Sequence, residues 1–585
     1  MFKLFKNLDK KDWCLVVLTL LLVSASVFFE LSIPDYMSEI TKIIGLKGSM
    51  NEIIVAGLKM VSCAILGAGC SCIVGFLASI ISASFGYKLR GMIFSKVQSF
   101  SIAEIKGFST SSLIIRSTND VTQVQNVLTM GLKMAVKSPI MAVWAICKIL
   151  SKSWQWSLAT ACAVVFIVII LTVVIVFALP KFKVIQKQTD NLTRVSRENL
   201  TGVRVVRAFN AEGYQEEKFD NANKELTDTC LSINGVMSLI DPALMVIFNI
   251  LPLSIYFIGA YLISVQTGFE SKLFVFSDMV VFSSYAIQVV MSIVMLVIIF
   301  INLPRAIVSA NRINEVLNMP STVTDGAGNT DTDIVGEVEF NNVSFKYPDA
   351  EEYVLKDISF KAKKGQTVAF IGSTGSGKST LINLVPRFYD ATSGEIKIDG
   401  VDVKDYKLYD LNSKIAVIAQ RPILFSGTVL DNVTLGETDG EKPTEEDVIK
   451  AIKISKSDFV LNYPDKLNHE VNQGGKNYSG GQKQRLAIAR ALARNPEILI
   501  FDDSFSALDY KTDKELRIAI KQELTNTTCL IVAQRIGTIK DADKIIVLDN
   551  GVVVGEGTHK EILENCSVYK EIALSQLSEE ELKNG

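Results

Sequence analysis

Apolar and polar positions divide the chain into two halves. Residues 1–320 are mostly apolar with short polar breaks, whereas the pattern beyond residue 330 alternates between strand-like and helix-like segments. A helix needs about 20 apolar residues to cross a bilayer. Runs long enough to do so occupy residues 13–35, 54–83, 131–152, 155–180, 240–264 and 273–303. The pattern predicts an α-helical membrane domain of six spans over 1–320, a linker over 321–335 and an α/β domain over 336–585.

The connections between the apolar runs alternate in length, and their basic residues predict the orientation of the chain. Segments 84–130 and 181–239 are long and have the pattern of helices that leave the membrane and return. These segments and the N-terminal end carry most of the Lys and Arg of this half. The positive-inside bias places them in the cytoplasm, and with them the C-terminal half. We therefore expect a multi-pass protein of the cell membrane, with the lipid bilayer as its surroundings.

A few polar residues interrupt the apolar runs or lie close to their ends: Glu30, Lys59, Asp241, Asn249, Asp278 and Gln288. Because ionisable groups are costly in lipid, such residues often line a transport path. A position near the end of a span is also consistent with an interfacial location. Both interpretations stay open for each residue.

Composition excludes some functions. The net charge of −2 shows no polyelectrolyte bias, so we expect no nucleic-acid partner. The nine cysteines form no CxxC pair, and their apolar surroundings favour small buried residues in a reducing or membrane setting. His469 and His559 show no metal-ligand spacing around them.

A glycine-rich loop lies near the start of the predicted α/β domain. The strand-like TVAFIG (367–372) runs into GSTGSGKS (372–379), which matches G-x-x-x-x-G-K-[ST] between a strand and a helix. Its glycines let backbone N–H groups turn toward phosphate oxygens, and the helix N-terminus adds its positive dipole end. Lys378 is expected to reach the β- and γ-phosphates, and the Ser379 hydroxyl to bind Mg²⁺. The predicted ATP-binding residues are Gly372, Ser373, Thr374, Gly375, Ser376, Gly377, Lys378, Ser379 and Thr380, with ATP and Mg²⁺ as cofactors.

A second glycine-containing turn lies downstream in NYSGGQKQRLAIARAL (477–492). Ser479, Gly480 and Gly481 open an amphipathic helix, where backbone N–H groups are available to an anion. A simple helix cap is the better explanation of such a turn when it occurs alone. Two sites for phosphate in one domain instead suggest that one of them serves a neighbouring chain's nucleotide.

The stretch ILIFDDSFSALDY (498–510) predicts a buried strand that ends in two acids. A nucleotide hydrolase needs one carboxylate here for the metal shell and a second to orient water. Asp502 occupies the first position. Asp503 occupies the second, and its side chain is one methylene shorter than that of glutamate.

Together these motifs resemble those of the ATP-binding-cassette exporters, and in particular the degenerate-site subunit of bacterial heterodimeric multidrug exporters. The resemblance covers nearly the whole chain. In the membrane half, residues 108–125 and 198–212 are similar to the family's two intracellular-loop signatures, which implies coupling helices nearby that press on the nucleotide domains.

The resemblance also implies roles for individual residues. Tyr347 matches the aromatic residue that stacks on adenine, and Gln420 the glutamine that contacts Mg²⁺ and senses the membrane domain. Asp502 matches the Walker B aspartate, so the implied Mg²⁺ ligands are Ser379, Gln420 and Asp502. The implied signature is Ser479, Gly480, Gly481 and Gln482, with Tyr478 where leucine is usual, and the loop at the dimer interface contains Ser506 and Asp509.

Two departures concern catalysis. The family has glutamate after the Walker B aspartate and a histidine at the switch position, where this chain has Asp503 and Gln534. A misplaced general base forfeits much of a contribution of roughly 10²–10⁴ to the rate. Gln534 can donate a hydrogen bond but cannot be cationic or shuttle a proton. Asn472 and Gln473 also stand where Gly and Glu are common.

We therefore expect an ATP-driven exporter of amphipathic or hydrophobic compounds, formed with a second half-transporter. This chain would hold ATP and hydrolyse it weakly, while its signature would complete the partner's catalytic site. A homodimer that uses Asp503 as a slow base and an ATP-gated membrane regulator without vectorial transport are the alternatives. Apolar spans suit a hydrophobic cargo, but they also suit contact with lipid.

Overall fold

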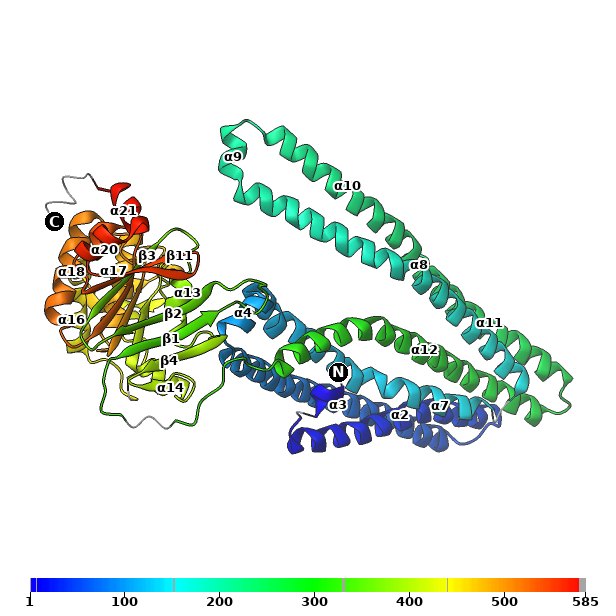
Figure 1. Ribbon diagram of the computed structural model, residues 1–585. Coiled ribbons are helices and arrows are strands. Elements are labelled where there is room, and N and C mark those ends of the chain that lie inside the picture. Colours follow the sequence, from blue (N-terminus) through cyan, green and yellow to red (C-terminus); the bar gives the residue numbers. More distant parts are fainter. Residues whose placement is uncertain (1, 7, 151–152, 329–331, 439, 578–585) are drawn as a thin grey trace. The chain divides into compact units, whose positions relative to one another are not determined.

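A computed structural model describes residues 2–6, 8–150, 153–328, 332–438 and 440–577 of the chain. The chain forms two compact units (Figure 1). One, the membrane unit, comprises Met1–Lys96 and Ser111–Asn318. The other, the soluble unit, comprises Val97–Thr110 and Met319–Gly585. Lys152, at the end of the apolar run 131–152, and residues 329–331 of the expected linker lie outside the described residues.

Long helices build the membrane unit. Over the described residues, six helical segments are long and apolar enough to cross a membrane, which confirms the six predicted spans. The principal helices of these segments are α2 (Lys10–Gly45), α3 (Met50–Gln98), α7 (Lys137–Leu150), α8 (Trp154–Thr201), α11 (Ile240–Val265) and α12 (Phe269–Asn318). The buried residues of α2, α7, α8, α11 and α12 form one shared core that includes Trp156, Phe282 and Tyr285.

The third membrane segment contains two irregular turns. Between α5 (Thr110–Ile115), α6 (Val121–Met130) and α7 lie the π-helical turns η1 (Arg116–Asp120) and η2 (Gly131–Ala135). A π turn is usually a single-turn bulge within an α-helix and is frequent at functional sites. Lys133 lies within η2.

The long connection between the fourth and fifth spans is helical, as expected from its pattern. Helix α8 continues to Thr201, the short α9 (Val203–Ala208) follows, and α10 (Glu212–Met237) returns alongside α8 (Figure 1). Apolar side chains at the tip of this hairpin are exposed, including Leu200, Val205 and Phe209.

The first long connection belongs in part to the soluble unit. Helix α4 (Ile102–Phe108) lies within Val97–Thr110, although sequence alone assigns this stretch to the membrane half. Ile102 and Ala103 pack against the core of the antiparallel sheet. Glu104 accepts hydrogen bonds from the backbone N–H groups of Ser101, at 2.6 Å, and Thr322, at 3.1 Å. Burial acts to raise the pKa of Glu104, but the bonds from Ser101 and Thr322 outweigh it and lower this pKa.

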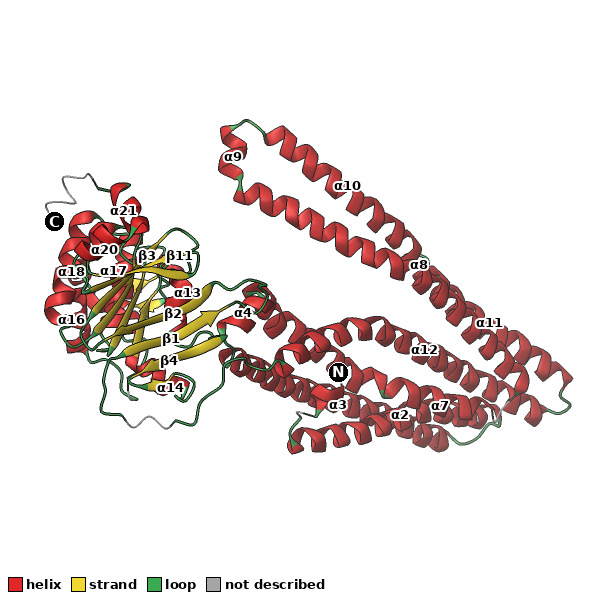
Figure 2. Cartoon of the chain, in the orientation of Figure 1, coloured by secondary structure: helices red, strands yellow, loops and turns green. Residues whose placement is uncertain are grey.

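Two large sheets form the soluble unit (Figure 2). The four-stranded sheet is antiparallel, in the order β2 (Leu355–Ala362), β1 (Val338–Phe345), β4 (Ser393–Ile398) and β5 (Val401–Asp402). The six-stranded sheet is in the order β12 (Val552–Gly557), β11 (Lys544–Asp549), β3 (Thr367–Gly372), β10 (Thr528–Val532), β9 (Ile498–Asp502) and β6 (Ile415–Ile418). Only β12 is antiparallel to its neighbour, so the loops after the other strands gather at one edge.

Strand β3 is buried on both faces, as expected for a strand within a parallel sheet. Successive side chains of a strand point to opposite faces. Val368 and Phe370 belong to the core between the two sheets, and Ala369 and Ile371 belong to the core under the helices of the other face. The strand that carries the phosphate loop is therefore held from both sides.

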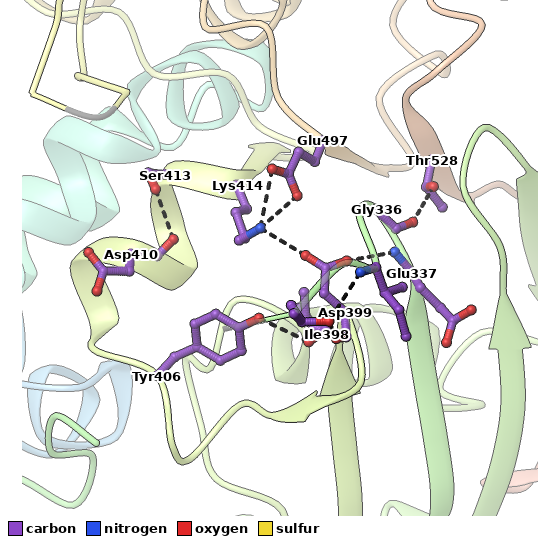
Figure 3. A network of polar contacts seen from close by, with 12 residues as sticks. Gly336, Glu337, Ile398, Asp399, Tyr406, Asp410, Ser413, Lys414, Glu497 and Thr528 are labelled. Carbon is purple, nitrogen blue, oxygen red and sulfur yellow. Dashed lines mark hydrogen bonds and ion pairs between the residues drawn. The ribbon is translucent and has the colours of Figure 1, made fainter. Parts of the chain in front are cut away.

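A partly buried ion network joins the two sheets (Figure 3). Lys414, directly before β6, donates to Asp399 at 2.8 Å and to Glu497 at 2.9 Å. Asp399, which follows β4, has a fully buried side chain and also accepts from the backbone N–H of Glu337 at 2.9 Å. Burial acts to lower the pKa of Lys414, but the hydrogen bonds that it donates to Asp399 and Glu497 raise it overall.

The cysteines differ between the units. Cys529 and Cys566 of the soluble unit are buried, as expected. The expectation of burial is wrong for four cysteines on membrane helices, which are exposed on the chain: Cys14, Cys72, Cys147 and Cys162. These helices present apolar surface outward, where a thiol behaves as a small apolar side chain.

Candidate nucleotide-binding site

The glycine-rich loop lies between β3 and helix α13 (Lys378–Leu384). Gly375 has φ of +85° and Gly377 has φ of +96°, a left-handed conformation that favours glycine. A Cβ on Gly377 would lie 2.7 Å from Leu355 Cδ2 and 3.1 Å from the carbonyl oxygen of Val354. Backbone conformation and available space therefore both require glycine at residue 377.

Lys378 extends back over this loop. Its Nζ donates to the carbonyl oxygens of Gly372, at 2.9 Å, and Ser373, at 2.7 Å, and to Ser376 Oγ at 3.2 Å. Burial lowers the pKa of Lys378, and the carboxylates of Asp503 and Asp502 act in the opposite direction. The ammonium group is thus fixed at the mouth of the loop, where the expected phosphates would bind.

Two of the predicted metal ligands, Ser379 and Asp502, meet at the edge of the sheet. Ser379 Oγ, in the first turn of α13, donates to Asp502 Oδ1, at the end of β9, over 2.7 Å. Burial raises the pKa of Asp502, and the Ser379 bond acts against this effect. A hydroxyl and a carboxylate oxygen at this separation fit the hard-oxygen preference of Mg²⁺. Ser379 and Asp502, with the amide oxygen of Gln420, are the residues that would hold the ion next to the phosphates.

Asp503 occupies a constrained turn directly after β9. Its φ is +47°, a region that Asp enters more readily than most residues with a Cβ. Its backbone N–H donates to the carbonyl oxygen of Val532 at 3.0 Å, which anchors the turn to β10. Burial raises the pKa of Asp503, although the hydrogen bond from Gln420 acts to lower it.

Two glutamines converge on a single oxygen of Asp503. Gln420, two residues beyond β6, donates from Nε2 to Asp503 Oδ2 at 3.1 Å. Gln534, two residues beyond β10, donates to the same oxygen at 2.9 Å. The Gln534 backbone is held in turn by Gln576 Nε2, which donates to its carbonyl oxygen at 2.7 Å. The carboxylate at the expected catalytic position is thus held by two amides, neither of which can take a proton.

Tyr347 lies between the phosphate-loop helix and α4. Its hydroxyl is 3.0 Å from Thr380 Oγ1, and its ring meets that of Tyr389 edge-on at 5.4 Å. Lys106 of α4 places its ammonium 5.2 Å from the centre of the Tyr347 ring, within the range of a cation–π contact. The neighbouring Tyr389 raises the pKa of Lys106, so this side chain stays cationic.

The signature residues form a well-capped helix N-terminus. Ser479 is the N-cap of α17 (Gly480–Leu492). Its Oγ accepts a hydrogen bond from the backbone N–H of Gln482 at 3.3 Å. In return, Gln482 Oε1 accepts a hydrogen bond from the backbone N–H of Ser479 at 2.9 Å. Tyr478, where leucine is usual, is buried next to Tyr463 and His469, whose rings stack at 3.9 Å. This departure fills an aromatic cluster and leaves the capping geometry of the signature intact.

The interface loop between β9 and α18 (Tyr510–Glu523) is held at both ends. Ser506 Oγ donates to the carbonyl oxygen of Asp503 at 2.8 Å. Asp509 is the N-cap of α18 and accepts from the backbone N–H of Thr512 at 3.0 Å, which lowers the pKa of Asp509. Asn472 begins a tight turn before the signature and precedes Gln473 in η5 (Gln473–Gly475).

Some of these interactions have no signal in the sequence. The motifs identify Gln420, Asp503 and Gln534 separately, but their shared hydrogen bonds depend on three different strand ends meeting. The contact of Lys106 with Tyr347 joins residues that are far apart in the chain. The described residues contain no cluster of three or more His, Cys, Asp or Glu side chains suited to a metal.

A phosphate-loop domain joined to a six-helix membrane unit defines a nucleotide-driven membrane transporter. The family model for the ABC transporter matches residues 355–506, and that for the ABC transporter transmembrane region matches residues 15–294. The chain is 37% identical over 570 residues, 96% of each chain, to an uncharacterised ABC transporter ATP-binding protein of Mycobacterium tuberculosis. The protein belongs to the ABC transporter family and is a multi-pass membrane protein with a cytoplasmic nucleotide-binding domain.

Two further relatives bear on the exporter class. An ATP-dependent lipid A-core flippase of Pseudomonas fluorescens is 34% identical over 499 residues, which are 84% of this chain and 80% of the flippase. A bacterial Atm1-family ABC exporter solved with ATP bound superposes with a TM-score of 0.79 over 97% of this chain and 99% of its own, at 24% identity. The fold is therefore that of an ABC exporter half-transporter, a class that binds and hydrolyses ATP and works as a dimer in the membrane.

Proposed function

We propose that this chain is the weakly hydrolysing subunit of a heterodimeric exporter of amphipathic compounds. The observation that carries the proposal is the geometry of Asp503. One of its carboxylate oxygens accepts hydrogen bonds from both Gln420 and Gln534. Its side chain is one methylene shorter than that of glutamate, about 1.5 Å of reach.

Position, rather than acidity, disables this carboxylate. Burial raises the pKa of Asp503, which by itself makes the group a stronger base. A general base must also lie within about 2.6–3.2 Å of the proton that it takes. Asp503 is shorter than the family's glutamate and is tied to two side-chain amides. Gln534 cannot replace the missing histidine as a cation or as a proton carrier.

The remaining parts of the site support ATP binding. Lys378, Ser379 and Asp502 have the arrangement expected for holding phosphates and Mg²⁺. The capped helix that starts after Ser479 presents free backbone N–H groups to an anion. In the dimers of this family each nucleotide lies between one chain's phosphate loop and the other's signature. The signature here would then serve the partner's nucleotide, and the hydrolysis that resets the transporter would occur there.

The nature of the cargo is supported by the relatives. Lipid A-core flippases from Pseudomonas are 32–34% identical to this chain. Their names describe movement of a large amphipathic molecule. A cargo with both polar and apolar parts is the corresponding proposal for this chain.

The proposal is tested by removing the carboxylate of each site separately. The complex is purified from its native membrane, and Asp503→Asn is compared with the corresponding carboxamide change in the partner. We expect Asp503→Asn to leave ATP turnover nearly unchanged and the partner's change to abolish it. Turnover that is lost with Asp503→Asn would place the chemistry at Asp503 and overturn the asymmetric assignment.

A further inference from the structure

A cavity of about 470 Å³ lies inside the membrane unit. Its wall comes from residues of α2, α3, η2, α7 and α12. Two of the polar residues found within the apolar runs, Glu30 and Gln288, line it. A volume of this size is typical of small-molecule sites, which usually combine apolar walls with a few polar groups.

One ion pair in this cavity is already satisfied. Lys137 Nζ of α7 lies 2.6 Å from Glu30 Oε1 of α2. Ser26 Oγ donates to the same oxygen at 3.2 Å and lies 2.8 Å from Ser71 Oγ of α3. Glu30 therefore neutralises Lys137 and is itself tied to two helices.

A second lysine in the cavity has no such partner. Lys133 lines the cavity from the π turn η2, four residues before Lys137. Among the described residues, no carboxylate forms an ion pair with Lys133 and no side chain or backbone group forms a hydrogen bond with it. Its Nζ lies 3.9 Å from the position that a Cβ on Gly75 would occupy, so the ammonium packs against bare backbone of α3. The cavity holds two lysines and one glutamate, which leaves one positive charge uncompensated.

The rest of the lining has two complementary properties. Gln288 Oε1 is buried and accepts no hydrogen bond from the described residues, so a ligand with a hydroxyl or amine could donate to it. Met134, Met141, Met291 and Met295 form much of the apolar wall. Methionine side chains are flexible and polarisable and adapt to apolar ligands of different shape.

We infer that this cavity binds an amphiphile with an acidic group, such as a carboxylate or phosphate. The acid pairs with Lys133, and the apolar part lies against the methionines. An unpaired charge on a membrane-spanning segment is costly, so such a residue is often functional. A ligand acid would remove that cost. The inference rests on the proposed export function, for which it names the class of cargo.

Binding to the complete transporter tests the inference without ATP turnover. The purified transporter is placed in nanodiscs of phosphatidylcholine, and three probes with the same chain are titrated: dodecyl phosphate, dodecyl maltoside and dodecyltrimethylammonium. We expect dodecyl phosphate to bind more tightly than either of the others. Lys133→Gln should weaken its binding about tenfold, the usual effect of losing a charge-assisted hydrogen bond.

Two variants distinguish charge recognition from a structural effect. Glu30→Gln frees Lys137 and should strengthen dodecyl phosphate binding, opposite in sign to Lys133→Gln. The matched control is Lys59→Gln, an exposed lysine of α3 outside the cavity, which should bind all three probes as the native protein does. An intact complex that binds dodecyl maltoside as the native protein does shows that the membrane unit of each variant is folded. The inference is overturned if dodecyl phosphate and dodecyl maltoside bind equally, or if Lys133→Gln and Lys59→Gln behave alike.

A further experiment distinguishes an acidic ligand that enters from the lipid from one that enters as a free amphiphile. Phosphatidic acid placed in the nanodisc should compete with dodecyl phosphate if the ligand enters from the lipid, and should not compete if it enters as a free amphiphile. Either result supports the proposed site as long as Lys133→Gln weakens the binding of dodecyl phosphate. Because the assay reads binding in the membrane unit, its failure is separate from a failure of the asymmetric hydrolysis tested with Asp503→Asn.

Discussion

Introducing glutamate at residue 503 and histidine at residue 534 is the sharpest perturbation of the nucleotide site. Asp503→Glu extends the carboxylate by about 1.5 Å. Gln534→His removes one of the two amides bonded to Asp503 Oδ2, which it contacts at 2.9 Å, and supplies a ring that can carry a proton. A well-placed general base contributes roughly 10²–10⁴ to the rate. Recovering the lower end of this range, about 10²-fold, lowers the activation barrier for ATP hydrolysis by about 2.7 kcal/mol.

The backbone sets a limit on this gain. Residue 503 has φ of +47°, which Asp tolerates better than most residues, and a left-handed conformation costs other L-residues about 1–2 kcal/mol. Asp503→Glu alone is therefore expected to give a small increase that is partly offset by strain. The double variant should exceed the product of the single effects, because the two side chains touch the same atom.

Phosphate release at this site is measured in the complex whose partner carries a carboxamide in place of its catalytic carboxylate. Hydrolysis then reports on the Asp503 site alone. Gln522→His, at an exposed position of α18, is the control for adding a histidine. If the double variant hydrolyses ATP no faster than the native chain, the reach of Asp503 and the amides around it do not explain a weak site.

Three further predictions concern the soluble unit. Lys378→Ala should remove ATP from this site, seen as lost photolabelling of this chain, while turnover at the partner's site persists in part. Lys414→Met leaves the buried Asp399 without its cationic partner and should destabilise the unit by about 3–5 kcal/mol. This loss should appear as faster hydrogen exchange in β6 and β9. Adding Asp399→Asn to Lys414→Met should recover much of the lost stability. The lowered pKa of Glu104 means that its contribution is complete above the unfolded pKa of 4.5 and is lost as pH falls through the folded value. Amides of α4 should therefore exchange faster as the pH falls below 4.5 and through the lowered pKa of Glu104, and Glu104→Gln should remove this pH dependence.

Sequence patterns predict those parts of the molecule that depend on local periodicity. The length of the apolar runs is sufficient for six spans, because a bilayer needs about 20 apolar residues per helix. The fully buried run in β9 and the strand–loop–helix context of residues 367–380 are sufficient to locate the nucleotide site.

Other features depend on contacts between distant residues and have no local signal. The loops after β6, β9 and β10 bring Gln420, Asp503 and Gln534 together, and this convergence is set by strand order. The assignment of α4 to the soluble unit follows from its packing, because Ile102 and Ala103 contact the core of the antiparallel sheet. The unpaired state of Lys133 becomes visible only once Glu30 is seen to bind Lys137.

The composition of the native complex tests the central claim most directly. The chain is purified by affinity from its own membrane in mild detergent, and the complex is weighed intact and its subunits identified. The account predicts a one-to-one complex with a second ABC half-transporter that carries glutamate after its Walker B aspartate and histidine at its switch position. A dimer of this chain alone, or a partner that lacks the glutamate, would contradict it.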